Sequence, residues 1–382
     1  MKLRSSLKSI GIALLVLFLL VSTLFAYWFY RPIDYNANSN IRIDTWNVVN
    51  DGKHNAFTDM IYWNGSFYLA YTVSSFHSGS VYSKIVIKKS SDAKNWKELV
   101  QLDGNGSDIR DPKLTVVKDR LFVFALNNAK IFAFPTETVY SFTSDAGSSW
   151  SKFKNINLNG WLIWRPKTAD SVTWFAPFYW HDLGEAYLLK STDCINWSIA
   201  GKMYKGDQTS ETEIQFLNDS IMISVVRMEF SDNYWDYPEG FTRIFKSSFP
   251  FNDWSSNIKS DLTRLDGPML FTYNGNVYAI GRYQPKPSGL MRLLGGLFNR
   301  KRTSIFIIKN YELIHLVDVL SSGDTSYSGA VIDKDTLYFS YFTSDTTKDY
   351  PWILGMFNST SVRMGKVNLT DLEKLAKSKF AD

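Results

Sequence analysis

Three short segments of the chain repeat one pattern. In each, an aspartate follows a run of β-forming residues, and a tryptophan comes a few residues after the aspartate. They are Ser90–Trp96, Thr143–Trp150 and Ser191–Trp197. Successive aspartates of the three segments are about 53 and 48 residues apart. A period of about 50 residues is typical of propellers, in which each repeat is one small sheet. This spacing constrains the fold more than any other feature of the sequence.

Each segment also has the composition of a hairpin turn. An Asp side chain accepts hydrogen bonds from the N–H groups of its own turn. Asn95, Gly147 and Asn196 suit a backbone position with positive φ. The tryptophan is expected to fold back over the end of its sheet, and none of this requires a substrate. We therefore assign structural roles to Asp92, Trp96, Asp145, Trp150, Asp193 and Trp197.

The chain after residue 40 alternates short β-rich runs with tight turns, such as Asn64-Gly65 and Asn274-Gly275. Hydrophobic residues make up 45% of the chain, which is enough for a sizeable core. At roughly 50 to 57 residues per four-stranded blade, the remaining chain fits six blades best, with five or seven as alternatives. The sequence thus predicts an all-β, six-bladed β-propeller. A short C-terminal helix is expected after the capping box Thr370–Glu373.

The N-terminus carries an apolar run from Ile10 to Tyr30, preceded by Lys2, Arg4 and Lys8. As a helix this run is roughly 30 Å long, which matches the hydrocarbon core of a bilayer. The basic end should remain in the cytoplasm and place the propeller outside. The alternative is a cleaved signal peptide. The predicted organisation is a cytoplasmic tail (1–9), a transmembrane signal anchor (10–30), a polar linker (31–40) and the propeller (41–382).

Composition narrows the classes of partner. The net charge of +5 comes from scattered Lys and Arg, whereas nucleic-acid binders usually concentrate these residues on one stripe, so a nucleic-acid partner is not expected. The single cysteine, Cys194, excludes an internal disulfide. The four histidines are far apart, and no phosphate-binding glycine loop is visible, so neither a metal motif nor a cofactor motif is expected. Aromatic residues reach 16%, and their flat rings are suited to holding sugars.

Polar clusters stand at the beginning of five predicted strands. Asp-Pro and Gly-Asp pairs often make ordinary turns, so each cluster taken alone has a structural explanation. Because the clusters recur at the same place in each blade, we expect them to share one site at the centre. They are His54–Asp59, Asp108–Lys113, Trp164–Pro166, Ser210–Glu213 together with Arg227, and Gly323–Gly329.

The chain resembles the sialidases and their uncharacterised relatives. The turn segments are similar to Asp boxes, Ser-x-Asp-x-Gly-x-x-Trp, and Thr143–Trp150 keeps the full spacing. The motifs at His54–Asp59, Arg110–Leu114 and Gly323–Tyr327 are similar to those of sialidase-like proteins of bacteria and archaea. The resemblance implies a propeller with Asp-box (BNR) repeats, in a membrane-anchored branch of that group.

The resemblance also implies roles for particular residues. Sialidases use a tyrosine nucleophile, a glutamate that assists it, and three arginines that hold the substrate carboxylate. By resemblance, Tyr327 is the nucleophile, Glu211 its assistant and Arg227 the second arginine. Arg282 or Arg302 would be the third. We expect His54, Arg110, Arg165 and Asp324 to join the arginines in substrate binding.

Two groups that a sialidase needs are missing. The arginine of the first blade has no counterpart near Phe57. The following loop, Val73–Val81, contains His77 but no aspartate to act as the acid. A positioned acid contributes roughly 10²–10⁴ in rate, and paired arginine contacts hold a carboxylate strongly. We therefore do not expect ordinary sialidase activity.

A second catalytic reading uses carboxylates alone. Asp59, Asp111 and Glu211 resemble the acidic residues of furanosidase-type propellers, and two carboxyl groups suffice for glycoside hydrolysis. The predicted function is thus a membrane-anchored, glycan-acting protein, a glycoside hydrolase; the alternative is a non-catalytic glycan- or partner-binding propeller. The apolar and basic stretch 285–302 is either a simple insertion or a loop that touches the membrane or covers the site.

Overall fold

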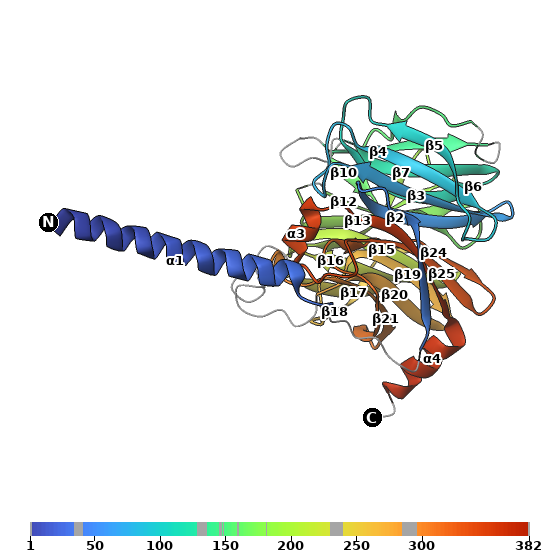
Figure 1. Cartoon of the computed structure of the whole chain (residues 1–382). Coiled ribbons are helices and arrows are strands. Elements are labelled where there is room, and N and C mark those ends of the chain that lie inside the picture. Colours follow the sequence, from blue (N-terminus) through green and yellow to red (C-terminus); the bar gives the residue numbers. More distant parts are fainter. Residues whose placement is uncertain are drawn as a thin grey trace.

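Six antiparallel sheets form the body of the molecule in the computed structural model (Figure 1). The structure describes residues 2–33, 41–127, 136–144, 147, 149–158, 160–180, 182–229, 240–284 and 296–380. Strands of neighbouring sheets contact one another around the ring, including those of the first and the last sheets. The prediction of a six-bladed, nearly all-β propeller is confirmed.

Blades 1 to 5 each run from an inner to an outer strand in chain order, whereas blade 6 takes its outer strand from the start of the propeller sequence. Apolar residues of adjacent blades form the core between them. Blade 1 contains β2 (His54–Trp63), β3 (Ser66–Ser74), β4 (Lys84–Ser90) and β5 (Lys97–Asp103), and blade 2 contains β6 (Ile109–Val117), β7 (Arg120–Asn127), β8 (Glu137–Thr143) and β9 (Lys154–Asn155). Blade 3 contains β10 (Trp161–Ile163), β11 (Lys167–Thr168), β12 (Trp174–Trp180), β13 (Glu185–Ser191) and β14 (Ser198–Lys205).

The second half of the ring follows the same order. Blade 4 contains β15 (Thr209–Asn218), β16 (Ile221–Met228), β17 (Phe241–Ser248) and β18 (Ser255–Ser260), and blade 5 contains β19 (Asp266–Tyr273), β20 (Asn276–Tyr283), β21 (Arg302–Lys309) and β22 (Glu312–Val319). Blade 6 contains β23 (Thr325–Ser326), β24 (Ala330–Asp333), β25 (Thr336–Thr343), β26 (Ser361–Asn368) and β1 (Ile43–Val49).

The ring is closed by pairing the two ends of the propeller sequence. The early strand β1 is the outer strand of blade 6 and pairs with β26 in antiparallel register, with Ile43 opposite Val367. The side chain of Arg363 on β26 donates to Thr45 Oγ1 at 3.0 Å and to Asn47 Oδ1 at 2.8 Å. Both ends of the propeller sequence therefore stabilise the same sheet.

The predicted turns are formed by side-chain hydrogen bonds. Asp92 accepts the N–H groups of Lys94 and Asn95 at 2.9 and 2.8 Å. Asp193 accepts the N–H group of Asn196 at 2.8 Å. The expectation of positive φ at Asn95 and Asn196 is wrong. The residue directly after each Asp has the positive φ instead, so that each Asn side chain is left to donate to its Asp.

Two of the three tryptophans bond within their own turns. Trp96 Nε1 donates to the carbonyl of Ala93 at 2.9 Å, and Trp197 Nε1 donates to the carbonyl of Cys194 at 3.2 Å. Trp150 is half-buried and packs at the edge of the core between blades 1 and 2. Asp145 lies outside the described residues.

The N-terminal apolar run is a helix, α1 (Lys2–Tyr30), that projects from one end of the ring (Figure 1). Its segment Ser6–Tyr27 has a mean hydropathy of 2.6 and is long and apolar enough to span a membrane, as signal sequences near an N-terminus also are. The chain directly after α1 contacts the propeller. Arg31 donates from Nε to the Asp349 carbonyl at 2.5 Å, and its own carbonyl accepts the Asp349 N–H at 3.2 Å.

Two short helices complete the described structure. The C-terminal helix α4 (Leu369–Ser378) was expected, but its N-cap is Asn368, whose side chain accepts the Asp371 N–H. The predicted capping box at Thr370–Glu373 therefore begins two residues too late. The helix α3 (Trp352–Phe357) was not expected, because it is only 6 residues long and follows a proline in a loop-like sequence.

Candidate active site at the centre of the propeller

The inner strands carry an irregularity near their beginnings, where the polar clusters of the sequence lie. In four blades the pairing register between the first and second strands shifts there, which is the mark of a β-bulge. In blades 3 and 6 the inner strand is broken into two pieces. Bulges re-aim side chains, so these strands turn their polar groups toward the centre. Positive φ values at these positions occur at Phe57, Asp111, Gly267 and Tyr327.

Tyr327 and Glu211 form the central pair of the site. The Tyr327 hydroxyl donates to Glu211 Oε1 at 2.5 Å. The second oxygen, Oε2, accepts the backbone N–H of Gly267 at 2.7 Å and lies 2.8 Å from Arg227 Nη1. The same Nη1 is 3.5 Å from the Tyr327 hydroxyl. Tyr327 and Glu211 are 5% and 4% exposed, so both act in a nearly water-free environment.

Burial and charge decide the protonation of this pair. Burial raises the pKa of the Glu211 carboxyl, and Arg227 opposes that rise. Burial, followed by the charge of Glu211, raises the pKa of Tyr327 well above its ordinary value. Tyr327 is therefore a neutral phenol, and its hydroxyl proton points at the Glu211 carboxyl group. That is the arrangement of an oxygen nucleophile beside its base.

Each arginine around the pair is held by carboxylates. Arg227 also bonds Glu229 and lies 3.6 Å from Asp266. Arg264 bonds the same two carboxylates. Arg282 reaches Asp266 at 3.4 Å and lies with its guanidinium carbon 5.2 Å from the centre of the Tyr327 ring. The positive charge of the site is thus matched by negative charge within it.

The structure separates the two candidates for the third arginine. Arg282 stands over Tyr327 and bonds Asp324 at 2.9 Å. Arg302 is fully buried and bonds Asp349 at 2.8 Å, on the side where α1 joins the propeller. Of the two, Arg282 therefore lies at the central pair.

Asp324 is a hub that gathers residues from several loops. Its Oδ1 accepts Arg282 Nη2 and Trp352 Nε1, both at 2.9 Å. Its Oδ2 lies 2.6 Å from His77 Nδ1 and 3.2 Å from His54 Nε2. The donors hold the pKa of Asp324 well below its ordinary value, although burial opposes them.

Two imidazoles and a carboxylate are also a donor set for a transition-metal ion. The ligand atoms of His54, His77 and Asp324 lie within 4.8 Å of one another. His54 Nδ1 contacts the carbonyl of Asn358 at 2.8 Å, as the outer nitrogen of a metal-bound histidine commonly does. The sequence did not reveal this cluster, because its members come from three separate stretches of chain.

Asp59 lies in a separate ion-pair network. It accepts Arg165 Nη2 at 2.9 Å and, through Oδ2, the N–H of Leu114 at 2.7 Å. Arg165 also bonds Glu213, which lies 3.2 Å from Lys167. Arg165 thereby ties the inner strands of blades 1, 3 and 4 together. These contacts occupy both Asp59 oxygens.

Arg110 contacts the loop that carries His77, and Asp111 pairs with a lysine that lies over the Trp164 ring. Asp111 is paired with Lys113, whose Nζ lies 4.1 Å from the centre of the Trp164 ring and 5.9 Å from that of Tyr327. Arg110 bonds Asp108 at 2.7 Å and donates to the carbonyls of residues 77 and 78. Arg110 therefore positions the loop that carries His77.

Sequence reasoning missed the contribution of the inner strand of blade 5, although it named Arg282 in the next strand of that blade. Asp266 and Gly267 supply an ion-pair partner and a hydrogen bond to the central pair, and Glu229 and Arg264 extend that network. The available signal was the Asp266-Gly267-Pro268 triplet, which begins an inner strand as the other clusters do. Phe57, in the place without an arginine, packs its ring 5.0 Å from that of Tyr327 and 5.3 Å from that of His77.

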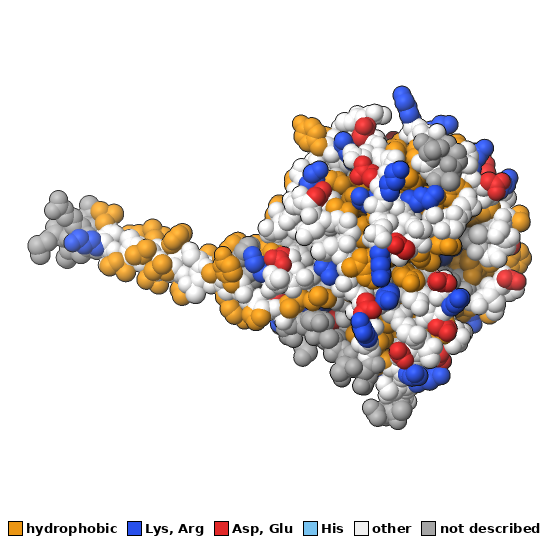
Figure 2. Space-filling view, turned by 45° about the vertical axis from the view of Figure 1, so that its right-hand side comes forward, with side chains coloured by type: hydrophobic (Ala, Val, Ile, Leu, Met, Phe, Trp, Pro, Cys, Tyr) orange, Lys and Arg blue, Asp and Glu red, His pale blue; other side chains and the backbone are white. Residues whose placement is uncertain are grey.

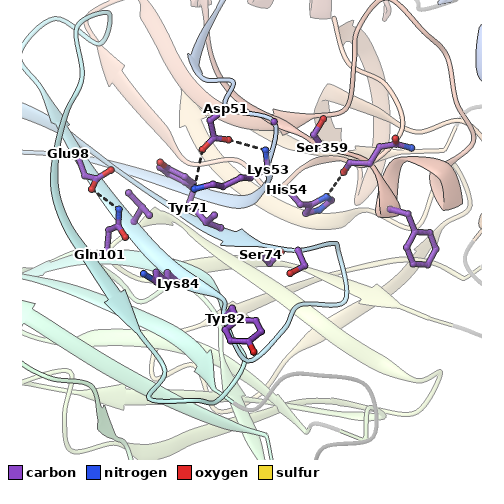
Figure 3. A pocket seen from close by; sticks show the side chains of 16 residues that line it. Asp51, Lys53, His54, Tyr71, Ser74, Tyr82, Lys84, Glu98, Gln101 and Ser359 are labelled. Atoms are coloured by element: carbon purple, nitrogen blue, oxygen red, sulfur yellow. Dashed lines mark hydrogen bonds and ion pairs between the residues drawn. The ribbon is translucent and has the colours of Figure 1, made fainter.

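A cavity of about 610 Å³ lies beside the centre, against the sheet of blade 1 (Figure 3). Its lining is mostly polar and includes His54, Lys53, Tyr71, Glu98 and Gln101. Glu98 and Gln101 are joined by a hydrogen bond of 2.8 Å. Tyr327 and Glu211 do not line this cavity, so it shares only His54 with the candidate site.

Comparison with known proteins supports the fold. No protein-family model and no curated protein sequence matches the chain. A protein of unknown function from Dyadobacter fermentans matches in structure with a TM-score of 0.64 at 15% identity, over 87% of this chain and 100% of that one. A Trypanosoma rangeli sialidase mutant displaying trans-sialidase activity matches with a TM-score of 0.63 at 12% identity.

That match covers 91% of this chain but only 61% of the trypanosomal protein. A Hadza microbial sialidase matches with a TM-score of 0.59 at 15% identity, over 83% of this chain and 66% of that one. At such low identity these likenesses concern the architecture alone. The chain therefore has the fold of a sialidase-like six-bladed β-propeller.

Proposed function

We propose that the protein is a membrane-anchored glycoside hydrolase in which Tyr327 is the nucleophile and Glu211 its base. The observation that carries the proposal is the 2.5 Å hydrogen bond from the Tyr327 hydroxyl to Glu211, with Arg227 beside both groups. Glu211 takes the phenolic proton as the Tyr327 oxygen forms a bond to the anomeric carbon and the glycosidic oxygen leaves. Water then hydrolyses the glycosyl-tyrosine.

The leaving oxygen has no carboxylic acid beside it in the loop from Ser75 to Ser83, which carries only His77 as a titratable side chain near the centre. Burial lowers the pKa of His77, so at neutral pH its imidazole is mostly neutral and lacks the proton that a general acid would donate. The proposal therefore includes a strong dependence on the leaving group. Acidic leaving groups such as dinitrophenol depart without help, whereas alkyl alcohols need the missing proton.

The charge balance favours a neutral sugar over an anionic one. Arg227, Arg264 and Arg282 are opposed by the carboxylates of Glu211, Glu229, Asp266 and Asp324. An arginine that already bonds a carboxylate has fewer donors left for the carboxylate of a ligand. We therefore propose uncharged glycans as the substrate class.

The membrane part of the proposal concerns α1. We propose that it stays attached as a signal anchor with its basic end in the cytoplasm, which places the propeller outside. The length and hydropathy of Ser6–Tyr27 support this proposal, because a helix of 22 residues with a mean hydropathy of 2.6 can cross the hydrocarbon core of a bilayer.

The test is turnover of a panel of neutral 2,4-dinitrophenyl, 4-nitrophenyl and phenyl glycosides by the full chain. Tyr327→Phe and Glu211→Gln should each lower turnover by at least 10²-fold, the low end for loss of a positioned catalytic group. Tyr341→Phe is the matched control, because that buried hydroxyl donates to the carbonyl of Leu320 outside the central pair. A 2-deoxy-2-fluoro glycosyl fluoride should leave a mass adduct on Tyr327. Full turnover by Tyr327→Phe would refute the proposed nucleophile.

A second candidate function is glycan binding without catalysis. The observation that favours it is the shielding of Tyr327 and Glu211 from solvent. Phe57 packs against the Tyr327 ring, and both members of the pair are almost fully buried. In that case the panel gives no turnover, a glycan array gives binding, and Glu211→Gln leaves the binding nearly unchanged. Loss of binding in Glu211→Gln would argue against this alternative.

A further inference from the structure

The end of α1 is fixed to the propeller by more than its covalent connection. Arg31 follows α1 directly, its N–H still bonded to the Tyr27 carbonyl at 3.0 Å. It then exchanges two hydrogen bonds with the backbone of Asp349, and its Nε lies 3.9 Å from the Asp349 carboxylate. Asp349 is itself fully buried and bonds Arg302 at 2.8 Å and Arg300 at 2.9 Å. We call the contact between Arg31 and Asp349 the anchor clamp.

The anchor clamp lies next to the candidate site in the chain and in space. Asp349 is separated by two residues from Trp352, the first residue of α3. Trp352 Nε1 donates to Asp324 Oδ1 at 2.9 Å, and the Arg282 guanidinium stacks on the Trp352 ring at 5.0 Å. One short segment, 349–352, therefore touches both the end of the membrane helix and the hub of the site.

The length of α1 places this segment near lipid. The 22-residue segment Ser6–Tyr27 is about 33 Å long as a helix, which fills a hydrocarbon core of about 30 Å. Arg31 follows within one helical turn and belongs at the headgroup level. Figure 1 shows α1 leaving the ring beside α3, and Figure 2 shows apolar side chains along α1 up to the body of the propeller.

The same end of the ring carries the starts of the inner strands. Tyr327 follows β23, and His77 lies in the loop between β3 and β4, where its N–H donates to the carbonyl of Met356 in α3. Exposed aromatic side chains flank this end, with Phe357 at 67% and Tyr82 at 80% exposure. The opposite end, with the turns that follow the inner strands, points away from α1.

We propose that the site faces the bilayer and takes glycans that are themselves attached to the membrane, as the headgroups of glycolipids are. This inference rests on the proposed function and specifies its substrate class. The anchor clamp leaves no spacer between bilayer and propeller, so a headgroup meets the site in two dimensions at high effective concentration, whereas a dissolved glycan must diffuse into a narrow gap.

The first experiment measures orientation without any turnover. A single cysteine replaces Phe357, the last residue of α3, or, as the matched control, Ile332 in β24 at the opposite end, and each is labelled with bimane. The native Cys194 is buried and burial raises the pKa of its thiol, so it resists labelling. The full chain is placed in phosphatidylcholine vesicles that contain a headgroup spin-labelled lipid.

Bimane at position 357 should be quenched at least threefold more than bimane at position 332, and Arg31→Ala should reduce that difference by freeing the helix end. Equal quenching at both positions, or none at 357, would overturn the proposal even if the protein hydrolyses aryl glycosides.

The second experiment concerns substrate and uses the sugar that the aryl panel identifies. The full chain in vesicles receives that sugar as a hexadecyl dinitrophenyl-linked glycoside in the bilayer or as the soluble dinitrophenyl glycoside. A kcat/KM at least tenfold higher for the bilayer form supports the inference, and equal values overturn it. If the panel gives no turnover, the proposed hydrolase fails and the quenching pattern alone decides whether the site faces the membrane.

Discussion

Arg165→Met is the sharpest test of how the centre is divided between stability and chemistry. The Arg165 side chain is 8% exposed and bonds two carboxylates, Asp59 and Glu213, that are 1% and 0% exposed. Methionine keeps most of the stem but removes the charge, which leaves both carboxylates without their main partner. Breaking a buried ion pair in this way costs about 3–5 kcal/mol.

That cost converts into a measurable change in melting temperature. At roughly 2.1 cal/mol/K per residue, the unfolding entropy of a propeller of roughly 340 residues is about 0.7 kcal/mol/K, so Tm should fall by about 4–7 °C. Circular dichroism of the full chain in detergent follows the transition. Arg42→Met is the control, because the Arg42 side chain is 87% exposed in its pair with Asp44 and such pairs contribute little.

The companion variant Asp59→Asn separates the two catalytic readings. If Asp59 serves only to hold Arg165, its amide should lower Tm while turnover per folded molecule stays within about twofold of the parent. An unchanged Tm in Arg165→Met, combined with loss of turnover in Asp59→Asn, would refute this reasoning. It would instead favour hydrolysis by carboxylates that include Asp59.

Three further predictions concern single residues. Gly267→Ala should lower the free energy of unfolding by about 1–3 kcal/mol and also lower turnover, because φ is +61° and the new Cβ would lie 2.6 Å from the Tyr327 ring. Gly275→Ala is the control for backbone strain alone, since its φ is +75° and a Cβ there has nothing within 4 Å. Equal losses of stability in the two variants would exclude the ring contact as a cause. Burial raises the pKa of Asp266, but the neighbouring guanidinium groups outweigh burial and hold that pKa below its ordinary value. The ionised carboxylate therefore stabilises the fold above about pH 4, and this stabilisation fades as the pH falls further. Asp266→Asn should flatten the dependence of Tm on pH between about 5 and 2.5, and an unchanged slope would contradict this prediction. Asp193→Ala should lower stability by about 1–2 kcal/mol with no effect on turnover, since it removes acceptors for two turn N–H groups at 2.8 Å, and a thermal melt showing no loss would count against the turn's role.

The fold was accessible from sequence because its signals are local. The Asp and Trp of a turn such as Ser191–Trp197 bond within a few residues of each other, so their spacing survives in the sequence as a repeat. Helix α3 escaped prediction for the opposite reason. It is held by contacts from elsewhere, such as the bond from Trp352 to Asp324, and no periodic pattern marks it.

The candidate site was only partly accessible. The polar clusters at the beginnings of five predicted strands indicated a shared central site, and the Tyr327–Glu211 pair was suggested by resemblance. The ion-pair partners were not accessible, because they join distant positions. Nothing local announces that Arg165 bridges Asp59 and Glu213, or that Asp324 collects two histidines.

The closure of the ring through β1 has a consequence for the order of synthesis. Thr45 on β1 and its partner Arg363 on β26 are separated by 318 residues. At about 5–20 residues per second, β1 emerges from the ribosome about 15–60 s before the strand that will pair with it. Throughout that interval β1 has no partner strand, and the first five blades have no closing neighbour. The sixth blade can therefore be completed only after β26 has been made, and a chain that stalls before that point leaves an unpaired strand edge, the kind of edge that promotes aggregation.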